Sequence, residues 1–479
     1  MTKPSAMAEW TLALDQGSHA TRALVFDAAG HERLRVEEPV LTHRPREGWV
    51  EHEAEALWAS LETCLARVTQ KLGGDVARLG SAALCTQRSS VVCWSRADGR
   101  ALSPVLSWQD VRAADRLVAT GLDHAIVRAV TGLRLSPHYG ASKLAWCFDN
   151  LPPVAAAAAR GDLAMGPLAA WLVFRLSGGA TFAVDPCNAS RTLLWDLTTR
   201  DWSPHLLKAF GVPRAVLPEC RPNRSLWSTL RLDGHEVPLV IVTGDQSAVP
   251  FAFEAERPDT AYLTLGTGAF LQRLEEDGED SCTALLRSVV WQDGAKVLHA
   301  LEGTVNGAGA ALAWLAREEH REEAELLAHL PDWFTVVPDP PLFINAVGGL
   351  AAPFWRPEAR SWFAGEGDVR AKTVAVVESI AFLVQANLDA MRACRRPCGG
   401  IVAVGGLARL AGLLQRIATL SGLAVRSPDV REATAYGGAR LANPALPPLA
   451  LTHAAFPDVA AVGMLRRRYR TWREHIATA

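Results

Sequence analysis

Short apolar runs separated by small polar turns recur along this chain. Residues 12–14 and 23–26 are apolar and flank the turn Asp15-Gln16-Gly17-Ser18. Runs of this length, bounded by Gly, Asp and Ser, predict two paired strands. Residues 262–271 repeat the pattern around Gly266-Thr267-Gly268. Because an internal echo of this kind is typical of duplicated units, the pattern predicts two related lobes.

Between these hairpins the pattern changes from short runs to helical spacing. Leu57, Leu61, Leu65, Val68 and Leu72 recur at helical intervals, which predicts a helix over 53–72. The apolar runs 79–85 and 238–243 predict buried strands. Each run ends in polar residues, which places them at the strand ends where open α/β sheets bind ligands.

The polar residues after these two strands are Gln87 and Arg88 in one case and Asp245 and Gln246 in the other. A hairpin over 90–107 is expected to bring Trp108 to the start of a helix. We place a lobe boundary between about 247 and 258, after the second strand.

Beyond this boundary the pattern predicts a strand at 297–301, a strand at 401–404, and helices over 307–319, 372–394 and 407–420. Gly309 allows close approach to the start of the first of these helices, where backbone amides attract phosphate. Gly405 and Gly406 follow the second strand.

Composition narrows the class of protein. Among 479 residues, Lys and Arg number 49 and Asp and Glu 51, so no net field indicates nucleic acid or an anionic membrane as a partner. Nine scattered cysteines do not predict a disulfide framework, and no apolar run has the length of a membrane span. We therefore expect a soluble protein of a reducing cytoplasm that acts on a small molecule, with a homodimer allowed.

Several enzyme classes lack their signatures in this sequence. It contains no Gly-Lys-Ser or Gly-Lys-Thr of a P-loop, and neither glycine turn continues as Gly-x-Gly-x-x-Gly. A Gly-x-Ser-x-Gly elbow and a His-Glu-x-x-His pair are also missing. These motifs therefore give no support to a P-loop kinase, a dinucleotide enzyme, a serine hydrolase or a zinc protease.

The turns carry the groups that a nucleoside triphosphate with Mg²⁺ requires. Clustered amides at Gly17 and Ser18 form an anion site, and Asp15 can hold the cation. Gly266, Thr267 and Gly268 offer a second set of donors, and Arg22 can add charge to the transferring group. A solvent-exposed hairpin and a surface salt bridge of Arg22 are the alternatives.

These motifs resemble the FGGY carbohydrate kinases, and within that family they are most similar to those of glycerol kinases. The resemblance rests on a set of motifs spread from residue 12 to about residue 440: Asp15-Gln16-Gly17-Ser18 with Arg22, Gly48-Trp49-Val50-Glu51-His52, Thr86-Gln87-Arg88, Asn188-Ala189-Ser190-Arg191-Thr192, Gly244-Asp245-Gln246 and Gly266-Thr267-Gly268. It implies an α/β fold of two actin-like (ribonuclease H-like) lobes, at 1–247 and 248–479, with an ATP cleft between them.

The resemblance also implies roles for particular residues. Asp245 is the expected catalytic base, and the alternative is a turn Asp that caps the next helix through Ser247. Gly405 and Gly406 match the glycine pair that lines the adenosine pocket. The expected substrate contacts are Arg88, Ser89, Trp108, His138, Asp245, Gln246 and Phe270. ATP is expected to contact Asp15, Gly17, Ser18, Arg22, Gly266, Thr267, Gly268, Gly309, Gly405 and Gly406, with Mg²⁺ at Asp15.

Two positions depart from the glycerol kinase pattern. Ser89 stands where those kinases carry an acid after the Arg, and His138 stands where they carry Tyr. The sequence therefore predicts a kinase for a terminal hydroxyl of a small polyol or sugar, with three substrate classes open: glycerol, a four- or five-carbon polyol, and a ketopentose such as xylulose or ribulose. A non-catalytic sugar- or nucleotide-binding regulator on the same fold is the alternative from another class.

Overall fold

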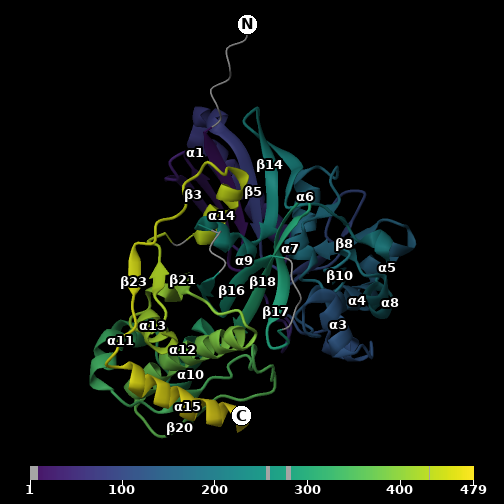
Figure 1. Cartoon of the computed structure of the whole chain (residues 1–479). Coiled ribbons are helices and arrows are strands. Elements are labelled where there is room, and N and C mark those ends of the chain that lie inside the picture. Colours follow the sequence, from purple (N-terminus) through teal and green to yellow (C-terminus); the bar gives the residue numbers. More distant parts are fainter. Residues whose placement is uncertain (1–8, 255–258, 277–281, 431, 479) are drawn as a thin grey trace. The chain divides into compact units, whose positions relative to one another are not determined.

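The computed structural model describes residues 9–254, 259–276, 282–430 and 432–478, and its contacts divide them into two compact units (Figure 1). The first unit combines Met1–Ala255 with two later segments, Arg287–His299 and Ala433–Pro448. The second combines Glu256–Leu286, Ala300–Glu432 and Leu449–Ala479. Segments from the C-terminal half of the sequence therefore complete the first unit. As a division into two functional lobes, the boundary after residue 247 stays a prediction.

The first unit is built on a six-stranded sheet with the order β13-β14-β5-β1-β2-β3. Its strands are β1 (Trp10–Gln16), β2 (Ala20–Phe26), β3 (Glu32–Pro39), β5 (Leu79–Thr86), β13 (Arg224–Leu232) and β14 (His235–Gly244). The predicted hairpin β1–β2 is antiparallel, whereas β5 pairs parallel to β1 and β14 parallel to β5. The carboxyl ends of β1, β5 and β14 therefore share one edge of the sheet.

A second, four-stranded sheet in this unit has the order β4-β7-β6-β8. Its strands are β4 (Glu51–His52), β6 (Val91–Ser95), β7 (Val105–Leu106) and β8 (Leu163–Pro167), and the remaining short pairs are β9 (Ala183–Val184) with β12 (Glu219–Cys220) and β10 (Trp195–Asp196) with β11 (Asp201–Trp202). The predicted hairpin over 90–107 is confirmed by antiparallel pairing of Val91 with Leu106 and of Trp94 with Ala101, although its second half forms a regular strand only at β7.

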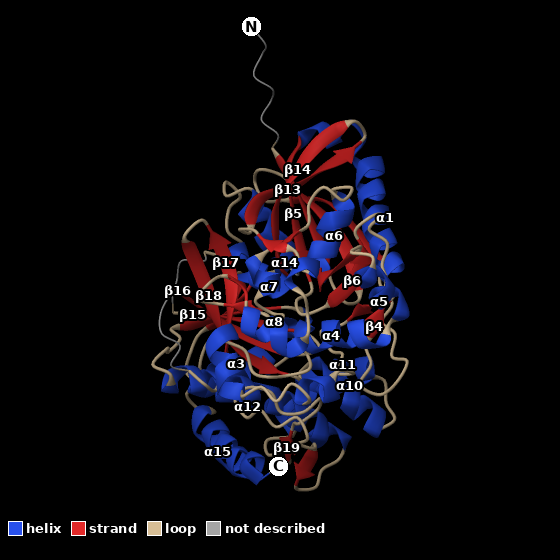
Figure 2. Cartoon of the chain, turned by 90° about the vertical axis from the view of Figure 1, so that its right-hand side faces the viewer, coloured by secondary structure: helices blue, strands red, loops and turns tan. Residues whose placement is uncertain are grey.

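Helices cover both sheets of the first unit (Figure 2). They are α1 (Ala54–Leu72), α2 (Ala114–Val118), α3 (His124–Thr131), α4 (Gly140–Asn150), α5 (Pro152–Ala159), α6 (Leu168–Leu176), α7 (Pro186–Ala189), α8 (Pro204–Phe210), α9 (Asp245–Ala248) and α14 (Ala433–Ala442), with 3₁₀ turns η1 (Gly73–Arg78), η2 (Arg214–Val216) and η3 (Val249–Ala252). The predicted helix α1 buries Leu57, Leu61, Cys64 and Val68. Leu65 is only partly buried, because Cys64 rather than Leu65 lies on the same helix face as Leu57, Leu61 and Val68.

The second unit repeats the strand order of the first. Its strands run β18-β16-β15-β21-β22-β23, with the hairpin β15–β16 antiparallel, β21 and β22 parallel to β15, and β23 antiparallel to β22. Their bounds are β15 (Thr260–Leu265), β16 (Ala269–Glu276), β18 (Lys296–Val305), β21 (Gly400–Val404), β22 (Val425–Ser427) and β23 (His453–Ala455). The strand β17 (Leu286–Asp293) precedes β18, and the segment Arg287–His299 of these two strands is counted with the first unit. The predicted internal repeat is thus confirmed at the level of topology.

The helices of the second unit include one with the length and hydropathy of a membrane span. They are α10 (Gly309–Glu318), α11 (Glu323–Val336), α12 (Val369–Ala393), α13 (Leu413–Ser421) and α15 (Val462–Thr478), with a hairpin β19 (Leu342–Ile344) and β20 (Trp362–Ala364). In α12, 94% of the most apolar 18-residue stretch is buried inside the protein, as in the core helix of a soluble protein. The predicted helix 407–420 is wrong at its start, because η4 (Gly406–Arg409) and a turn precede α13.

Helix α14 returns from the C-terminal part of the chain to pack on β1 and β5 in the first unit. A Cβ at Gly437 would lie 2.0 Å from Ala248 O, and one at Gly438 would lie 2.6 Å from Cys85 Sγ. Both glycines therefore allow an approach that a side chain would prevent. Thr434, in the first turn of α14, donates a hydrogen bond of 3.4 Å from Oγ1 to Asp245 O.

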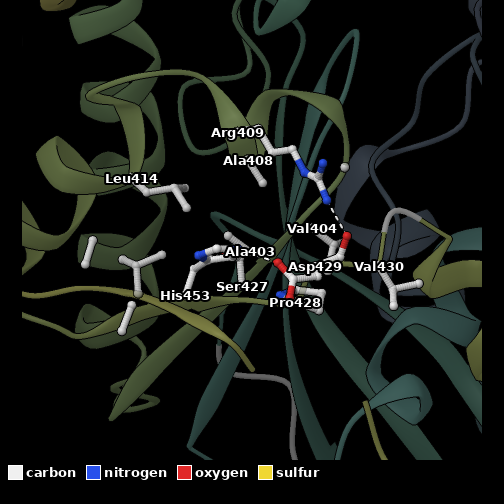
Figure 3. A pocket seen from close by; sticks show the side chains of 14 residues that line it. Ala403, Val404, Ala408, Arg409, Leu414, Ser427, Pro428, Asp429, Val430 and His453 are labelled. Carbon is white, nitrogen blue, oxygen red and sulfur yellow. Dashed lines mark hydrogen bonds and ion pairs between the residues drawn. The ribbon is translucent and has the colours of Figure 1, made fainter. Parts of the chain in front are cut away.

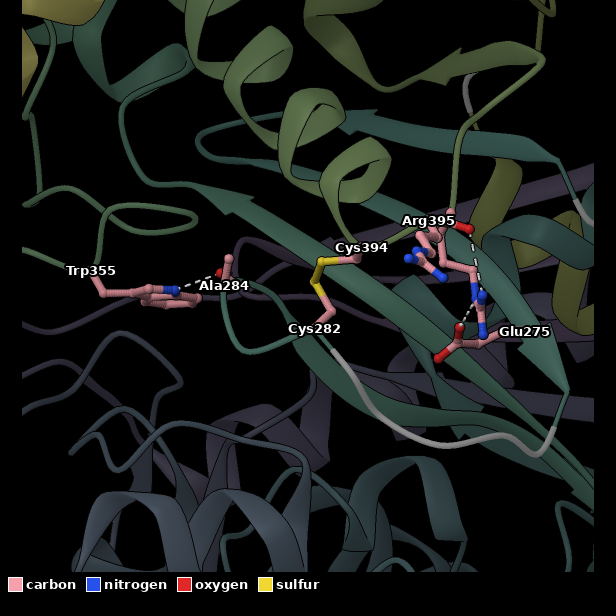
Figure 4. Close-up of a disulfide and its surroundings, with 7 residues drawn as sticks. Glu275, Cys282, Ala284, Trp355, Cys394 and Arg395 are labelled. Atoms are coloured by element: carbon pink, nitrogen blue, oxygen red, sulfur yellow. Dashed lines mark hydrogen bonds and ion pairs between the residues drawn. A yellow bond between two sulfur atoms is a disulfide. The ribbon is translucent and has the colours of Figure 1, made fainter.

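One disulfide joins two cysteines of the second unit, Cys282 and Cys394 (Figure 4). The expectation that no cysteine is paired is wrong for these two. Their Cα atoms lie 5.2 Å apart although 112 residues separate them in sequence, a proximity that spacing along the chain does not reveal. The other seven cysteines are free.

Candidate active site

The carboxyl edge of the first sheet carries the predicted base, Asp245, and the predicted Mg²⁺ ligand, Asp15, on strands that flank β5. In the strand register, Asp15 on β1 and Thr243 on β14 both lie opposite Cys85 on β5. Because neighbouring strands are about 4.8 Å apart, β1 and β14 are separated by about 10 Å. Asp15 and Asp245 therefore belong to one ligand-facing edge, as the strand ends predicted.

Asp245 is the first residue of α9 and lies next to Arg88. Asp245 Oδ1 accepts a hydrogen bond of 2.6 Å from Gln246 N and lies 3.9 Å from Arg88 Nε. A quarter of its side chain is exposed. A Cβ at Gly244 would lie 2.5 Å from Arg88 Cγ, so glycine at this position leaves room for the arginine. The carboxylate thus accepts the N–H of Gln246, and a cap through Ser247 stays the alternative prediction.

The loop after β5 holds Arg88 and Ser89 in a constrained conformation. Both residues are buried, and Ser89 has a φ of 65°, in the left-handed region that non-glycine residues adopt rarely. Strained backbone of this kind persists only where the surrounding contacts hold it. The position that departs from the glycerol kinase pattern is therefore also a strained one.

Trp108 lies in a turn, and the expectation that it begins a helix is wrong. Helix α2 begins six residues later, because Asp110 accepts the backbone N–H groups of Val50 and Arg112 and closes the turn instead. Trp108 Nε1 donates a hydrogen bond of 3.1 Å to Ser18 Oγ. The hydroxyl of Ser18 thus orients Trp108 and is not directed to phosphate alone.

Gln87, predicted with Arg88 at the ligand-binding end of β5 but not as a substrate contact, connects these loops. Its Oε1 accepts hydrogen bonds from Ser18 Oγ (3.1 Å) and Ser90 Oγ (2.9 Å), and its Nε2 donates to Gln16 Oε1 at 3.3 Å. Ser90 Oγ in turn accepts from Trp108 N at 3.0 Å. The sequence signal for this connecting role was the place of Gln87 directly after a predicted strand, between Thr86 and Arg88.

Two further predicted substrate residues of the first unit differ in their surroundings. His138 is exposed, and its Nδ1 lies 3.0 Å from Ser136 Oγ. Gln246 Oε1, by contrast, is buried and has no hydrogen-bond partner among the described residues. A buried acceptor in this condition is suited to a donor hydroxyl of a ligand.

The hairpin turn between β1 and β2 provides fewer phosphate donors than predicted. Gly17 N donates to Ala20 O at 3.0 Å, which uses its amide within the turn. The Ser18 amide donates to no carbonyl in the described ranges. Arg22 lies beside Asp15, at 3.8 Å between Nη1 and Oδ2, and also binds Glu37 through Nε at 3.0 Å. The alternative reading of Arg22 as a salt-bridge residue therefore holds in part.

In the second unit the predicted glycines converge on one another. Gly309 N donates to Gly266 O at 3.0 Å, and a Cβ at Gly309 would lie 2.9 Å from the same oxygen. Gly405 has a φ of 93°, and a Cβ there would lie 2.4 Å from Leu265 O. The turn 266–268, the start of α10 and the end of β21 thus form one backbone surface.

Some backbone amides of this surface already donate hydrogen bonds to carbonyls of the protein. Gly266 N donates to Gly268 O at 2.9 Å, so the amides of Gly266 and Gly309 are not open donors as predicted. Thr267 N and Gly268 N donate to no carbonyl within residues 259–276 and the other described ranges. These two amides are the donors that this turn can offer to an anion.

Beside Gly405 lies a cavity of about 430 Å³ (Figure 3). Its walls are mostly apolar, with Arg409, Asp429 and His453 at its polar side. Arg409 Nη2 donates to Asp429 O, and His453 Nε2 lies 2.5 Å from Asp429 Oδ1. Gly406 follows Gly405 at the start of η4. Phe270, the last predicted substrate residue, lies on β16 in this unit.

A buried lysine lies beneath the loops of the first unit. Lys143 Nζ donates to Ser107 O at 2.6 Å and to Ser89 O at 3.2 Å, and the side chain has no exposed surface. Burial lowers the pKa of Lys143 from 10.5 to about 7; the negative charge of Asp110 raises this pKa and the positive charge of Arg112 lowers it further.

This pKa predicts a pH-dependent stability. Between pH 7 and 10.5 the unfolded chain binds a proton at Lys143 that the folded protein has released, so the free energy of unfolding rises with pH across this window. Each pKa unit corresponds to about 1.4 kcal/mol. We expect wild type to gain a few kcal/mol relative to Lys143→Met in denaturant unfolding at pH 7, 8, 9 and 10. Parallel curves for the two proteins would contradict the depressed pKa.

Comparison with protein families shows two matches that together span most of the chain. Residues 10–251 match the N-terminal domain of the FGGY family of carbohydrate kinases. Residues 261–446 match the C-terminal domain of the same family.

Curated relatives share about a third of their residues with this chain. A glycerol kinase of Geobacter sp. (strain M21) is 36% identical over 453 residues, which covers 91% of this chain and 90% of that protein. A glycerol kinase of Myxococcus xanthus (strain DK1622) is 36% identical over 464 residues, with the same coverage.

Solved structures agree in fold. The glycerol kinase of Plasmodium falciparum with ADP has a TM-score of 0.84 at 22% identity, covering 98% of both chains. The xylulose kinase of Rhodospirillum rubrum has a TM-score of 0.84 at 19% identity, also over 98% of both chains. These matches confirm the predicted fold class of two actin-like α/β lobes.

Proposed function

Because the chain belongs to the FGGY family of carbohydrate kinases and is an ATP-dependent kinase, we propose that its substrate is a small polyol bound between Arg88, Asp245 and Trp108. The observation that carries this proposal is the grouping of a forked cation, a carboxylate and an indole at one sheet edge, next to the unpartnered Gln246 Oε1. Arg88 and the two acceptors suit neighbouring hydroxyls, and the indole suits C–H groups. Ser89 and Phe270 stay predicted contacts.

Asp245 is the proposed base. As the terminal hydroxyl oxygen attacks the γ-phosphorus, the O–H proton passes to the carboxylate of Asp245 and ADP leaves with the electron pair of the broken P–O bond. Two features support this role: the carboxylate is partly exposed, and the Arg88 guanidinium lies 3.9 Å from it. The Asp245 backbone is supported by Thr434 from α14.

We propose that the phosphates bind those turn amides that donate no hydrogen bond within the described part of the chain, and not the amide of every glycine in the two turns. Among the predicted turn amides, Ser18 N, Thr267 N and Gly268 N donate to no carbonyl of the described residues. Because backbone donors in a fixed turn need no reorganisation, they can stabilise charge that develops on the transferred group. The adenosine is proposed to lie against Gly405 and Gly406.

The carboxylates present fit Mg²⁺ held in part by phosphate. Among the described residues, no group of three or more His, Cys, Asp or Glu side chains is arranged to hold a metal ion. Mg²⁺ accompanying a nucleotide needs only one or two carboxylates, since water and phosphate supply its other ligands. Asp15, nearly buried at the end of β1, is the proposed ligand. When bound, the ion would neutralise phosphate charge.

An ADP-release assay tests the proposal. Purified protein is supplied with ATP, Mg²⁺ and one of glycerol, erythritol, xylulose or ribulose, and ADP is measured over time. Turnover with a polyol supports the proposed function, whereas preference for xylulose or ribulose would assign a ketopentose kinase. A protein that binds these compounds but releases no ADP would be a non-catalytic regulator.

Position 89 gives a prediction about substrate size. We expect wild type to prefer a polyol larger than glycerol, and Ser89→Glu to raise glycerol turnover relative to that substrate, because the new carboxylate restores a charged acceptor beside Arg88. A buried carboxylate without a partner would cost several kcal/mol, so the gain requires that both side chains face the ligand. Steady-state kinetics on the same four compounds measure the shift.

Two outcomes would count against this argument. If wild type already prefers glycerol, Ser89 does not exclude it. If Ser89→Glu folds but is inactive on all four compounds, the serine itself contacts the substrate.

A cytoplasmic location and a homodimer are proposed on the composition alone. The seven free cysteines support a reducing compartment. The disulfide between Cys282 and Cys394 is the feature that a thiol count under native conditions would test.

A further inference from the structure

Two loops that carry proposed substrate residues are joined through one buried side chain. Lys143, on α4, donates from Nζ to Ser89 O at 3.2 Å and to Ser107 O at 2.6 Å. Ser89 follows Arg88 directly, and Ser107 directly precedes Trp108. A single amino group therefore bonds to the backbone next to both residues.

We propose that Lys143 is a positioning residue that sets the separation of Arg88 and Trp108 and thereby the affinity for the polyol. The inference rests on the proposed function, because it takes these two residues as substrate contacts. Lys143 itself has no exposed surface, so its effect on substrate passes through the loops.

The bond to Ser89 O acts on the strained part of the site. Ser89 has a φ of 65°, a conformation that a serine keeps only when its surroundings impose it. Without the donor at its carbonyl, the residue can relax toward ordinary backbone angles. Because Arg88 precedes it directly, such relaxation would redirect the guanidinium that lies 3.9 Å from Asp245 Oδ1.

The bond to Ser107 O acts on a loop that has other supports. Ser107 O also accepts from Asp110 N at 3.0 Å, and Asp110 Oδ2 accepts from Val50 N at 2.6 Å. Trp108 N donates to Ser90 Oγ at 3.0 Å. The turn should therefore keep its fold without Lys143, and the lost feature would be its connection to the Ser89 loop.

The cost of burying an amine supports a role in the site. Lys143 lies on a helix whose buried positions are otherwise apolar or small, among them Ala141, Leu144, Ala145 and Cys147. An apolar side chain of similar length would fill this position without removing a charge or its donors from water. The compensation found here is two bonds to substrate loops, with Asp110 as the nearby opposite charge.

The test compares Lys143→Met with Lys71→Met, a matched change at an exposed lysine at the end of α1. For Lys143→Met we expect the KM for the preferred polyol to rise about tenfold or more, because small displacements of binding groups lower productive binding strongly. The KM for ATP and kcat should stay within about threefold in the same variant. Lys71→Met should behave as wild type.

Hydrogen exchange gives a readout that needs no substrate. In Lys143→Met the amides of 88–90 and 107–110 should exchange at least about tenfold faster than in wild type, while those of Trp10–Gln16 should not change. A general loss of stability would accelerate exchange in all three segments. Such a loss would also reduce the fraction of folded, active protein, which lowers the apparent kcat without changing KM.

Each result decides for or against the role. Unchanged polyol KM with unchanged exchange overturns it, as does an equal rise of the KM for ATP. If Lys143→Met does not fold, the same measurements are made on Lys143→Gln, whose amide keeps N–H donors. If Lys143→Gln is also unfolded, Lys143 serves stability and the proposal is wrong. If wild type phosphorylates none of the four compounds, the proposed function fails, and exchange at the two loops still decides whether Lys143 joins them.

Discussion

Asp245→Asn is expected to lower turnover at least about a hundredfold while leaving ATP binding nearly unchanged, the scale typical of the loss of a general base. The amide has the same shape and keeps an oxygen that can accept the N–H of Gln246, so the start of α9 should be preserved. What it loses is the ability to take the hydroxyl proton and the negative charge 3.9 Å from Arg88 Nε. The expected loss is therefore in kcat.

The measurement is steady-state ADP release on the preferred substrate, together with ATP binding by calorimetry. Asp75→Asn is the matched control, because Asp75 is an exposed carboxylate in η1 and its neutralisation changes the net charge by the same amount. Turnover in Asp245→Asn similar to that of the control would remove Asp245 from the role of base. Loss of ATP affinity in the same variant would place the residue at the nucleotide instead.

Asp15→Ala is expected to lower kcat/KM for ATP by about 10- to 100-fold, the range found when a residue that supports a metal through water is removed. The effect should follow the magnesium concentration, because screening of phosphate charge is proposed to depend on this carboxylate. Arg22 keeps its hydrogen bonds to Glu37, so no charge is left without a partner and the hairpin should stay folded.

A magnesium titration of activity for wild type and Asp15→Ala checks this prediction, with Asp75→Ala as the control for loss of a carboxylate. The variant should need more Mg²⁺ to reach half of its maximal rate. Identical titration curves and identical rates would show that Asp15 does not act on the Mg²⁺–ATP complex.

Local patterns were sufficient for most strands of the two sheets. The apolar runs that became β1, β5, β14, β15 and β21 are short, bounded by turn residues and buried, so each carries its own signal. Because β1, β5 and β14 are parallel, the polar residues that follow them share one edge, and Asp15, Arg88 and Asp245 could be expected together.

Elements without a strong local pattern were predicted less well. The second half of the 90–107 hairpin and the start of the 407–420 helix lack regular alternation or helical spacing, and tertiary contacts decide their form. Trp108 illustrates the reason, since Asp110 closes its turn by binding the backbone of Val50, sixty residues earlier.

The sequence by itself determined the family and the duplicated topology, because these depend on motifs and on apolar periods within short stretches, and from the same motifs it predicted the chemical groups of the site. The tertiary structure alone decided how those groups are supported. It showed that Gln87 and Lys143 join loops from different strands, that α14 returns to support Asp245, and that several glycine amides are used within their own turns. Contacts between residues far apart in the chain leave no period in the sequence, so the burial of a single lysine or the use of a single amide could be seen only after the chain was folded.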